Sequence, residues 1–174
     1  PPLLRGRRIA VARDAAFSFL YTANIETLEA LGAELVYFSP LHDAALPQAD
    51  AVWLPGGYPE LHAEAWSNNR AMHQSLHAHV AAGRPLLAEC GGMMALFDTL
   101  VTRDGETHVM AGLLPGACSM QARFQALGMQ ALDTPQGEIR GHSFHYSRLE
   151  TSMQPVARAR NPNGGPTAEA VYRQ

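Results

Sequence analysis

Cys90 is the residue of this chain whose surroundings best suit covalent chemistry. The apolar run 86–88 before it predicts a short buried strand, and Gly91-Gly92 after it opens a segment that predicts a helix. A side chain on a tight strand-to-helix turn stands clear of the sheet and can reach a substrate carbonyl. That turn needs small flanking residues, which Ala88 and Gly92 supply. The pattern predicts a nucleophile elbow with Cys90 at its tip.

The expected helix after Cys90 would assist the chemistry in two ways. Its N-terminal amides and dipole favour a thiolate over a thiol, and the amide of Gly91 could face an oxyanion. The alternative is that Cys90 is a packing residue, because free cysteines are among the most buried residue types. The small residues on both sides of Cys90 favour the nucleophile.

Two further segments contain candidate site residues. Arg123 is a single charge among apolar neighbours, so it is either a surface residue or the guanidinium that clamps a substrate carboxylate. In the segment 141–147, alternation along a strand would place His142 on one face and His145 on the other. Only one of these two histidines can therefore point at the Cys90 turn.

A second glycine turn, Gly56-Gly57, follows a predicted strand over 50–55, and Pro59 is expected to start the next helix. Two glycines allow backbone amides to approach a ligand closely. Further along, His73 and His77 have the spacing of a zinc pair on a helix over 70–82. They lack an intervening Glu and a third ligand, so we expect them on a solvated helix face.

The first third of the chain should position these groups. Strands over 8–13 and 33–39, with a helix over 25–31 between them, predict a right-handed parallel unit. The segment 14–24 lies at the carboxyl end of the first strand, where open α/β sheets bind ligands. Its ligand candidates are Asp14, Tyr21 and Asn24, whereas Phe17 and Phe19 are expected in the core.

The last third is expected to contain short strands and loops. Strands are predicted within 107–114, 120–132 and 138–149, and Cys118 is expected to be an ordinary thiol. From Thr151 onwards the Pro and Gly pairs predict a mobile loop. The final residues, 168–174, are expected to begin a strand.

Composition excludes several classes of function. All 13 basic residues are Arg, so a Walker A loop or a lysine Schiff base cannot be built from these 174 residues. The net charge of −3 and the lack of basic runs argue against nucleic acid and anionic membranes. With only two cysteines, no signal peptide and no long apolar stretch, the cytoplasm is the expected location.

Taken together, the motifs resemble one family, the C-terminal glutamine amidotransferase domain of cobyrinic acid a,c-diamide synthase. The matching segments, spread over residues 10 to about 150, are Ala10-Val-Ala-Arg-Asp-Ala-Ala-Phe-Ser-Phe, Phe38-Ser-Pro-Leu, Leu46-Pro, Pro55-Gly-Gly-Tyr-Pro-Glu-Leu, Ala88-Glu-Cys-Gly-Gly-Met-Met, Met110-Ala-Gly and Gly141-His-Ser-Phe-His-Tyr-Ser. An ordered set of this kind is far more specific than a lone cysteine motif.

The resemblance implies a flavodoxin-like class I glutamine amidotransferase fold, α/β, with a mostly parallel central sheet flanked by helices. It implies that Cys90 attacks the side-chain amide of glutamine and that Gly56, Gly57 and Gly91 form the oxyanion hole. Arg123 falls where related domains hold the glutamine carboxylate, and Tyr58, His142 and His145 are further candidates for lining the site.

The resemblance also implies a division of labour. No cofactor is expected in this domain, and ATP and Mg²⁺ are expected on an N-terminal synthetase domain that activates the corrin carboxylates. Residues 1–6 are interpreted as a linker remnant and 7–174 as the amidotransferase domain, truncated at both ends relative to the full-length protein. The lysine-free composition agrees with a synthetase domain that is absent here.

One departure from the family pattern affects the expected activity. Family members carry a catalytic histidine on a strand that follows a segment like Glu169-Ala-Val-Tyr-Arg173, and this chain stops at Gln174. His142 and His145 match a different family segment, in which Ser143 replaces a Glu. We therefore expect these residues alone to hydrolyse glutamine weakly or not at all.

Three alternatives remain open at this point. The acceptor could be that of cobyric acid synthase or of a nickel-sirohydrochlorin diamide synthase. A second alternative is a stand-alone cysteine hydrolase with His145 as its base. A third is a non-catalytic docking module in which Cys90 is simply buried.

Overall fold

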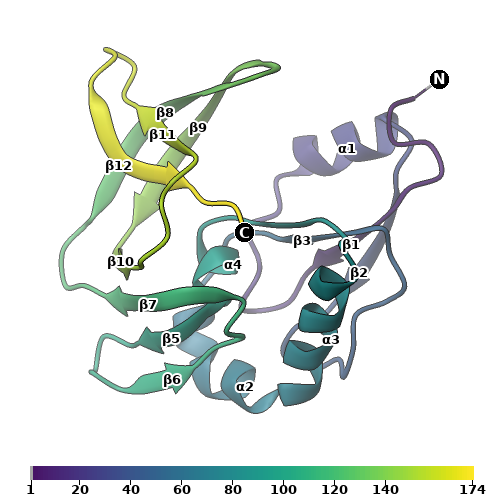
Figure 1. Ribbon diagram of the computed structural model, residues 1–174, viewed down its shortest axis with the longest axis horizontal. Helices are drawn as coiled ribbons and strands as arrows, with labels where there is room; N and C mark the ends of the chain where they lie inside the picture. The colour runs from purple at the N-terminus through teal and green to yellow at the C-terminus, as the bar shows by residue number, and fades with distance from the viewer. Residues whose placement is uncertain (1) are drawn as a thin grey trace.

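The computed structural model describes residues 2–174, and its centre is a parallel sheet of four strands in the order β2-β1-β3-β4 (Figure 1). Their bounds are β1 Arg8–Ala12, β2 Glu34–Phe38, β3 Ala51–Leu54 and β4 Leu86–Ala88. β1 lies between β2 and β3 and pairs in parallel with both. The parallel pairing of β1 with β2 is what the strand-helix-strand pattern predicts. All four strands end on the same edge, where the loops that contain the candidate residues begin.

Short helices connect the strands. They are α1 Thr22–Ala30, the 3₁₀ helix η1 Pro59–His62, α2 Ala63–Asn68, α3 Arg70–Ala81 and α4 Gly91–Met94. The side chain of Asn69 caps α3 by accepting a hydrogen bond from the Met72 amide. None of the helices within residues 2–174 is both long and apolar enough to cross a membrane.

The second half of the chain builds two more sheets. Strands β5 Phe97–Val101, β6 Thr107–Val109, β7 Leu114–Met120 and β10 Ser147–Glu150 form one of them, in the order β10-β7-β5-β6. Strands β8 Ala126–Thr134, β9 Gly137–His145, β11 Ala157–Arg160 and β12 Pro166–Val171 form the other, in the order β12-β11-β8-β9. Figure 1 shows this last sheet at the upper left, away from α3.

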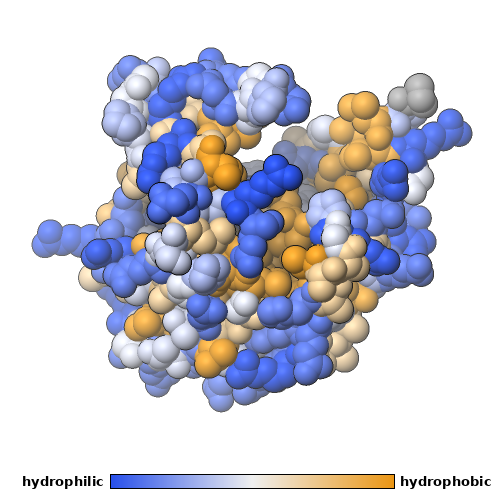
Figure 2. Space-filling model, in the orientation of Figure 1, coloured by the Kyte–Doolittle hydropathy of each residue, from blue (hydrophilic) through white to orange (hydrophobic). Residues whose placement is uncertain are grey.

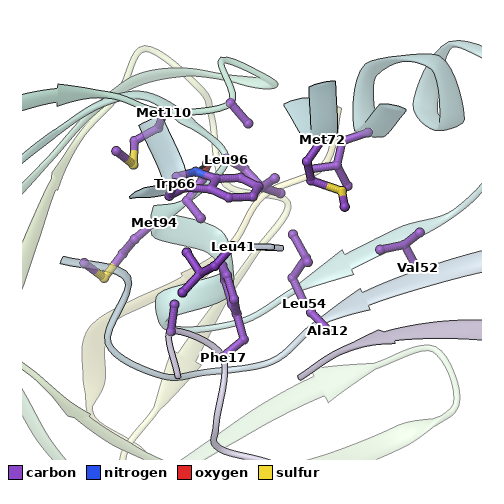
Figure 3. Packing of buried hydrophobic residues seen from close by; sticks show 14 of the residues in the cluster. Ala12, Phe17, Leu41, Val52, Leu54, Trp66, Met72, Met94, Leu96 and Met110 are labelled. Atoms are coloured by element: carbon purple, nitrogen blue, oxygen red, sulfur yellow. Dashed lines mark hydrogen bonds between the residues drawn. The ribbon is translucent and has the colours of Figure 1, made fainter. Parts of the chain in front are cut away.

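Trp66 of α2 is the centre of the core. Figure 3 shows Met72 to one side of the indole and Met110 to the other. The indole is fully buried, and its Nε1 donates a hydrogen bond to the Ala95 carbonyl at 3.1 Å. This bond satisfies the polar atom of the buried ring. The contact also ties α2 to the chain just after α4.

Two predicted segments differ from the structure in their secondary structure. The helix after Cys90 is a single turn, because the chain enters β5 at Phe97. The region after Thr151, predicted as a mobile loop, contains β11 and β12. Pro155, Pro162, Gly164 and Gly165 lie outside these strands, and Pro166 is the first residue of β12. Pairing of β11 with β12 and β8 supplies the backbone partners that sequence pattern could not show.

β4 is an edge strand, since it pairs only with β3 among the described residues. Leu87 is consequently 63% exposed, and Val80 of α3 is 37% exposed. A groove of about 480 Å³ follows this edge and ends at Tyr172 near the C-terminus. Figure 2 shows hydrophobic side chains, in orange, in the corresponding hollow at the centre of the view.

The solvated face expected for His73 and His77 is wrong for His73, whereas His77 is exposed as expected. His73 is 5% exposed and packs against the Trp66 indole, with ring centroids 4.5 Å apart. His77 donates a hydrogen bond from Nε2 to the Ala111 carbonyl at 2.7 Å. His73 therefore lies in the core, whereas His77 bonds to the segment that follows β6 and stays exposed to solvent.

Candidate functional site

Cys90 occupies the turn between β4 and α4 in a strained backbone conformation. Its φ of 50° and ψ of −121° make it the one non-glycine residue with positive φ among residues 2–174. Such backbone conformations cost about 1–3 kcal/mol and persist only where the surrounding structure enforces them. The strain lifts the thiol out of the sheet, and part of the side chain is open to solvent.

Close packing under this turn explains the glycines after the cysteine. A Cβ on Gly92 would lie 2.2 Å from the carbonyl oxygen of Leu54, which is backbone and cannot yield. A Cβ on Gly91 would lie 2.7 Å from the carbonyl oxygen of Gly57. The two positions therefore have room only for hydrogen, as an elbow packed against its neighbouring strand requires.

The two glycine turns meet at the sulfur. The backbone amides of Gly91 and Gly57 both lie near enough to the Cys90 sulfur to favour its charged form and lower its pKa. A Cβ on Gly56 would lie 3.3 Å from the Cys90 Cβ, so this residue also borders Cys90. Two amides that converge on one point can stabilise the negative oxygen of a tetrahedral intermediate formed there.

The segment after β1 positions the Gly56-Gly57 turn. The Phe19 amide donates to the Gly56 carbonyl at 3.0 Å, and the Tyr58 amide donates to the Ala16 carbonyl at 2.9 Å. The Phe19 and Tyr58 rings meet edge to face, with centroids 5.0 Å apart. Phe17 is fully buried as expected, whereas Phe19 is 36% exposed beside the site and is not a core residue.

Asp14 holds this segment in place. Its Oδ1 accepts from the amides of Ala16 and Phe17, and its Oδ2 accepts from the Leu41 amide and the Ser39 hydroxyl. All of these partners belong to the chain itself, so the carboxylate is occupied structurally. Of the other ligand candidates here, Tyr21 is 69% exposed and precedes α1, and Asn24 lies within α1.

Electrostatics at Cys90 oppose ionisation of the thiol. Burial of the sulfur raises its pKa, while the Gly91 and Gly57 amides lower it in part. The nearby carboxylates of Glu60 and Glu89 raise the pKa further, because a thiolate would be a third negative charge. α4 spans only four residues, so it provides local amides rather than the dipole of a long helix.

Neither histidine of the 141–147 segment serves Cys90 in this structure. His145 Nδ1 contacts the Ser147 carbonyl at 3.0 Å, and its Nε2 contacts the Glu169 carboxylate at 2.9 Å. Both contacts use N–H donors, and they raise the pKa of His145. His142 is exposed on the opposite face of β9, across from Met129. No histidine within residues 2–174 forms a hydrogen bond with the Cys90 sulfur.

Arg123 lies in the exposed connection between β7 and β8. Its carbonyl accepts a hydrogen bond from Gln125 Nε2 at 3.2 Å, and within residues 2–174 its guanidinium forms no ion pair. It does not line the cavity of about 550 Å³ beside the elbow, although Gln121, two residues earlier, does. Its role as a carboxylate clamp stays a prediction.

Three residues that sequence reasoning did not single out line that cavity. Glu60 comes from η1, Gln121 follows β7, and Tyr146 precedes β10. The sequence could have indicated Glu60 as a site residue, because it follows the Gly56-Gly57 turn by only a few residues. No local pattern indicated that Gln121 and Tyr146 would line the same cavity, because the long-range pairing of β7 with β10 brings them together.

A parallel α/β sheet with a strained cysteine elbow, and with two backbone amides at the sulfur, defines a cysteine amidotransferase or hydrolase of the elbow type. A solved structure described as a glutamine amidotransferase aligns with 95% of this chain and 89% of its own, at TM-score 0.62 and 18% identity. PurLQS from Thermotoga maritima aligns with 91% of this chain and 77% of its own, at TM-score 0.60 and 17% identity. The flavodoxin-like class I glutamine amidotransferase fold is confirmed.

The family model of the CobB/CobQ-like glutamine amidotransferase domain matches residues 8–174, and the chain belongs to this family. Hydrogenobyrinate a,c-diamide synthase from Stutzerimonas stutzeri is 58% identical over 172 residues, 99% of this chain and 40% of the relative. The Pseudomonas aeruginosa protein of the same name is 55% identical over 98% of this chain and 39% of the relative. Cobyrinate a,c-diamide synthase from Herminiimonas arsenicoxydans is 50% identical over 99% and 40%. The chain thus spans about 40% of the length of these relatives.

Proposed function

We propose that this chain is the glutaminase unit of a hydrogenobyrinic or cobyrinic acid a,c-diamide synthase. The observation that carries the proposal is the convergence of the Gly57 and Gly91 amides on the sulfur of a strained Cys90. Membership of the amidotransferase family supports glutamine as the donor. The names of the relatives support a corrin acid as the acceptor.

The chemistry follows from the geometry of the turn. The Cys90 sulfur attacks the side-chain carbonyl carbon of glutamine, and the carbonyl oxygen becomes an oxyanion. The Gly57 and Gly91 amides donate to this oxyanion. Collapse of the intermediate expels ammonia and leaves a glutamyl thioester on Cys90, and water then releases glutamate and restores the thiol.

The proton steps need a base that residues 2–174 do not bring to Cys90. We infer that a group from outside this chain accepts the thiol proton and returns it to the leaving ammonia. The 174 residues alone should therefore have weak glutaminase activity. This expectation agrees with the several effects that keep the Cys90 thiol protonated.

The ammonia would be used by a partner domain. We infer an N-terminal synthetase domain that binds ATP and Mg²⁺ and activates the a and c carboxylates of the corrin ring. The lysine-free sequence supports this division, because the phosphate-binding lysine of a Walker A loop would have to come from elsewhere. Glutamine is then the only substrate that this chain itself binds.

Two alternative functions differ in how well they fit. A related tetrapyrrole amidase, such as cobyric acid synthase, would use the same glutaminase chemistry and differ in the acceptor, which the partner domain selects. A stand-alone hydrolase with His145 as base fits poorly. Both ring nitrogens of His145 are already hydrogen-bonded, to the Ser147 carbonyl and to Glu169.

The test compares two nitrogen donors in the complete enzyme, with ATP and a corrin acid as acceptor. We expect Cys90→Ser to abolish glutamine-dependent amidation, a loss of at least about a thousandfold, because the nucleophile is removed. Amidation with free ammonia should continue at the wild-type rate. Product formation is measured by mass spectrometry.

Cys118→Ser is the matched control, because Cys118 is the other thiol of the chain and is 2% exposed. Its glutamine-dependent rate should stay within a few-fold of wild type once folding is verified. Retention of glutamine use by Cys90→Ser would contradict the proposed function. Loss of ammonia use as well would instead place Cys90 in the synthetase reaction.

A further inference from the structure

A cavity of about 550 Å³ lies beside the nucleophile turn, between η1 and the second sheet. Tyr58 and Glu60 form the wall that comes from the Gly56-Gly57 turn. Gln121 and Tyr146 form the facing wall. The volume exceeds that of one amino acid side chain, and polar groups line both walls, as in a site for a small polar ligand.

η1 is fixed against the elbow by direct packing. A Cβ on Gly91 would lie 2.7 Å from the Cδ atom of Pro59, so the Pro59 ring sits on the residue after the nucleophile. Glu60 is the next residue along η1. Its carboxylate lines the cavity, and its negative charge raises the pKa of the Cys90 thiol.

Glu60 has no cationic partner within residues 2–174. Its carboxylate forms no salt bridge there, and the hydrogen bond that it receives comes from its own backbone amide. Burial raises the pKa of this carboxyl group. A half-buried carboxylate without a partner is costly, and a cation that enters the cavity would relieve the cost.

The other charged groups around the cavity leave it negative. They are Glu64 of α2 and the cluster Arg103, Asp104, Glu106 and His108 at the β5–β6 turn. Glu106 lies 3.6 Å from His108, and Arg103 is the one guanidinium on the cavity wall. Four carboxylates against one arginine favour a ligand with a positive group.

We propose that Glu60 receives the α-ammonium group of glutamine and that this ion pair allows the Cys90 thiol to ionise. The proposal rests on the proposed function, because it takes glutamine as the substrate. Without glutamine, the charges of Glu60 and Glu89 both disfavour a thiolate. With glutamine bound, the ammonium cancels the charge of Glu60, whereas Glu89 stays bonded to the Trp53 indole at 2.9 Å. Substrate binding and activation of the nucleophile are thereby coupled.

This arrangement makes Glu60 a positioning and specificity residue. The ammonium would select an α-amino acid over a simple amide, since only the former supplies the cation. The thiol would stay protonated, and so less open to oxidation, whenever the site is empty. Both consequences require the same atom pair, the Glu60 carboxylate and the substrate nitrogen.

The first experiment measures KM in the complete enzyme for glutamine and for glutaramic acid, which lacks the α-amino group. We expect Glu60→Gln to raise the KM for glutamine on the order of 30-fold, because a charge-assisted hydrogen bond is lost. The KM for glutaramic acid should not change. The control Glu29→Gln removes an exposed charge of α1, outside this cavity, and should leave both KM values unchanged.

The second experiment titrates the thiolate absorbance of Cys90 in the complete enzyme, with Cys90→Ser as the blank. L-norvaline, an unreactive α-amino acid, should lower the pKa of Cys90, whereas pentanoate, which lacks the ammonium, should not. In Glu60→Gln the pKa should be lower without ligand, and L-norvaline should not shift it further. The pKa of Cys90 would not respond to L-norvaline in this way if Glu60 had only a structural role.

Some outcomes overturn the proposal. One is an equal rise in KM for glutamine and glutaramic acid in Glu60→Gln, and another is an equal effect from Glu29→Gln. A response to pentanoate as large as that to L-norvaline would also overturn it. Failure of the proposed function is distinguishable, because Cys90→Ser would then leave glutamine-dependent amidation intact.

Discussion

The position of the Cys90 thiol depends on an unusual backbone conformation at Cys90 and on the glycines that follow it. The positive φ at Cys90 directs the thiol away from β4, and the missing side chain at Gly92 lets the turn rest on the Leu54 carbonyl. Sequence pattern predicted this turn from the small residues around a cysteine. It could not show that Glu60 and Glu89 would raise the pKa of the same thiol.

A substitution at Gly92 tests this packing directly. We expect Gly92→Ala to lower the free energy of unfolding by about 3 kcal/mol, because its Cβ would lie 2.2 Å from the Leu54 carbonyl oxygen. Urea denaturation followed by circular dichroism measures the change. Gly141→Ala is the matched control, since a Cβ there meets no atom within 4 Å, and it should change stability by less than about 0.5 kcal/mol. Equal stability of the two variants would contradict the packing argument.

At the scale of elements, an ion pair joins two strands that are far apart in the sequence. His145 at the end of β9 contacts Glu169 of β12 at 2.9 Å, and both side chains are about a quarter exposed. The carboxylate of Glu169 raises the pKa of His145, and His145 lowers the pKa of Glu169. The pair connects β9 and β12, the two edge strands of the last sheet.

The pH dependence of this pair follows from both shifts. The His145 contribution is complete below the ordinary histidine pKa of 6.5 and is lost as pH rises through its raised pKa. The Glu169 contribution is complete above the ordinary pKa of 4.5 and is lost as pH falls through its lowered pKa. The pair therefore stabilises the fold most between pH 4.5 and 6.5.

We expect Glu169→Gln to cost about 1 kcal/mol of unfolding free energy near the middle of this window, and clearly less in alkaline solution. Urea denaturation at a series of pH values measures both. Glu150→Gln is the control, because the exposed Glu150 carboxylate lies 3.8 Å from Arg148 and should contribute little at either pH. A cost for Glu169→Gln that did not vary with pH would show that the pair is not ionic.

At the scale of the whole molecule, His73 lies where α2, α3 and the second sheet pack together. Its ring is buried against Trp66, and its Nε2 has no hydrogen-bond partner among residues 2–174. Burial, followed by the charge of Arg70, lowers the pKa of His73 to about 4. The core that supports the elbow therefore contains a neutral histidine.

This histidine should limit acid stability. The unfolded chain binds its proton near pH 6.5, whereas the folded chain binds it only near pH 4, so stability falls as pH drops between these values. The loss attributable to His73 is up to roughly 3 kcal/mol. His73→Phe keeps an aromatic ring beside Trp66 but cannot bind this proton. We expect its stability to fall less than that of the wild type as pH drops from 6.5 to 4.

Thermal unfolding from pH 7 to pH 4 measures this effect. His42→Gln is the control, because His42 is exposed and its replacement should leave the acid limb as it is. If His73→Phe unfolded with the same pH dependence as the wild type, protonation of another group would be responsible for the acid sensitivity.

The sequence by itself determined the parallel sheet, the turn that holds Cys90 and the glycines beside it, because these depend on short-range pattern and on residues without side chains. Only the tertiary structure decided which side chains meet across the two halves of the chain. The pairing of β7 with β10 brings Tyr146 opposite Glu60 in one cavity, and the pairing of β11 with β12 carries Glu169 to His145. Long-range strand pairing sets these distances, and no local preference of the residues involved encodes them.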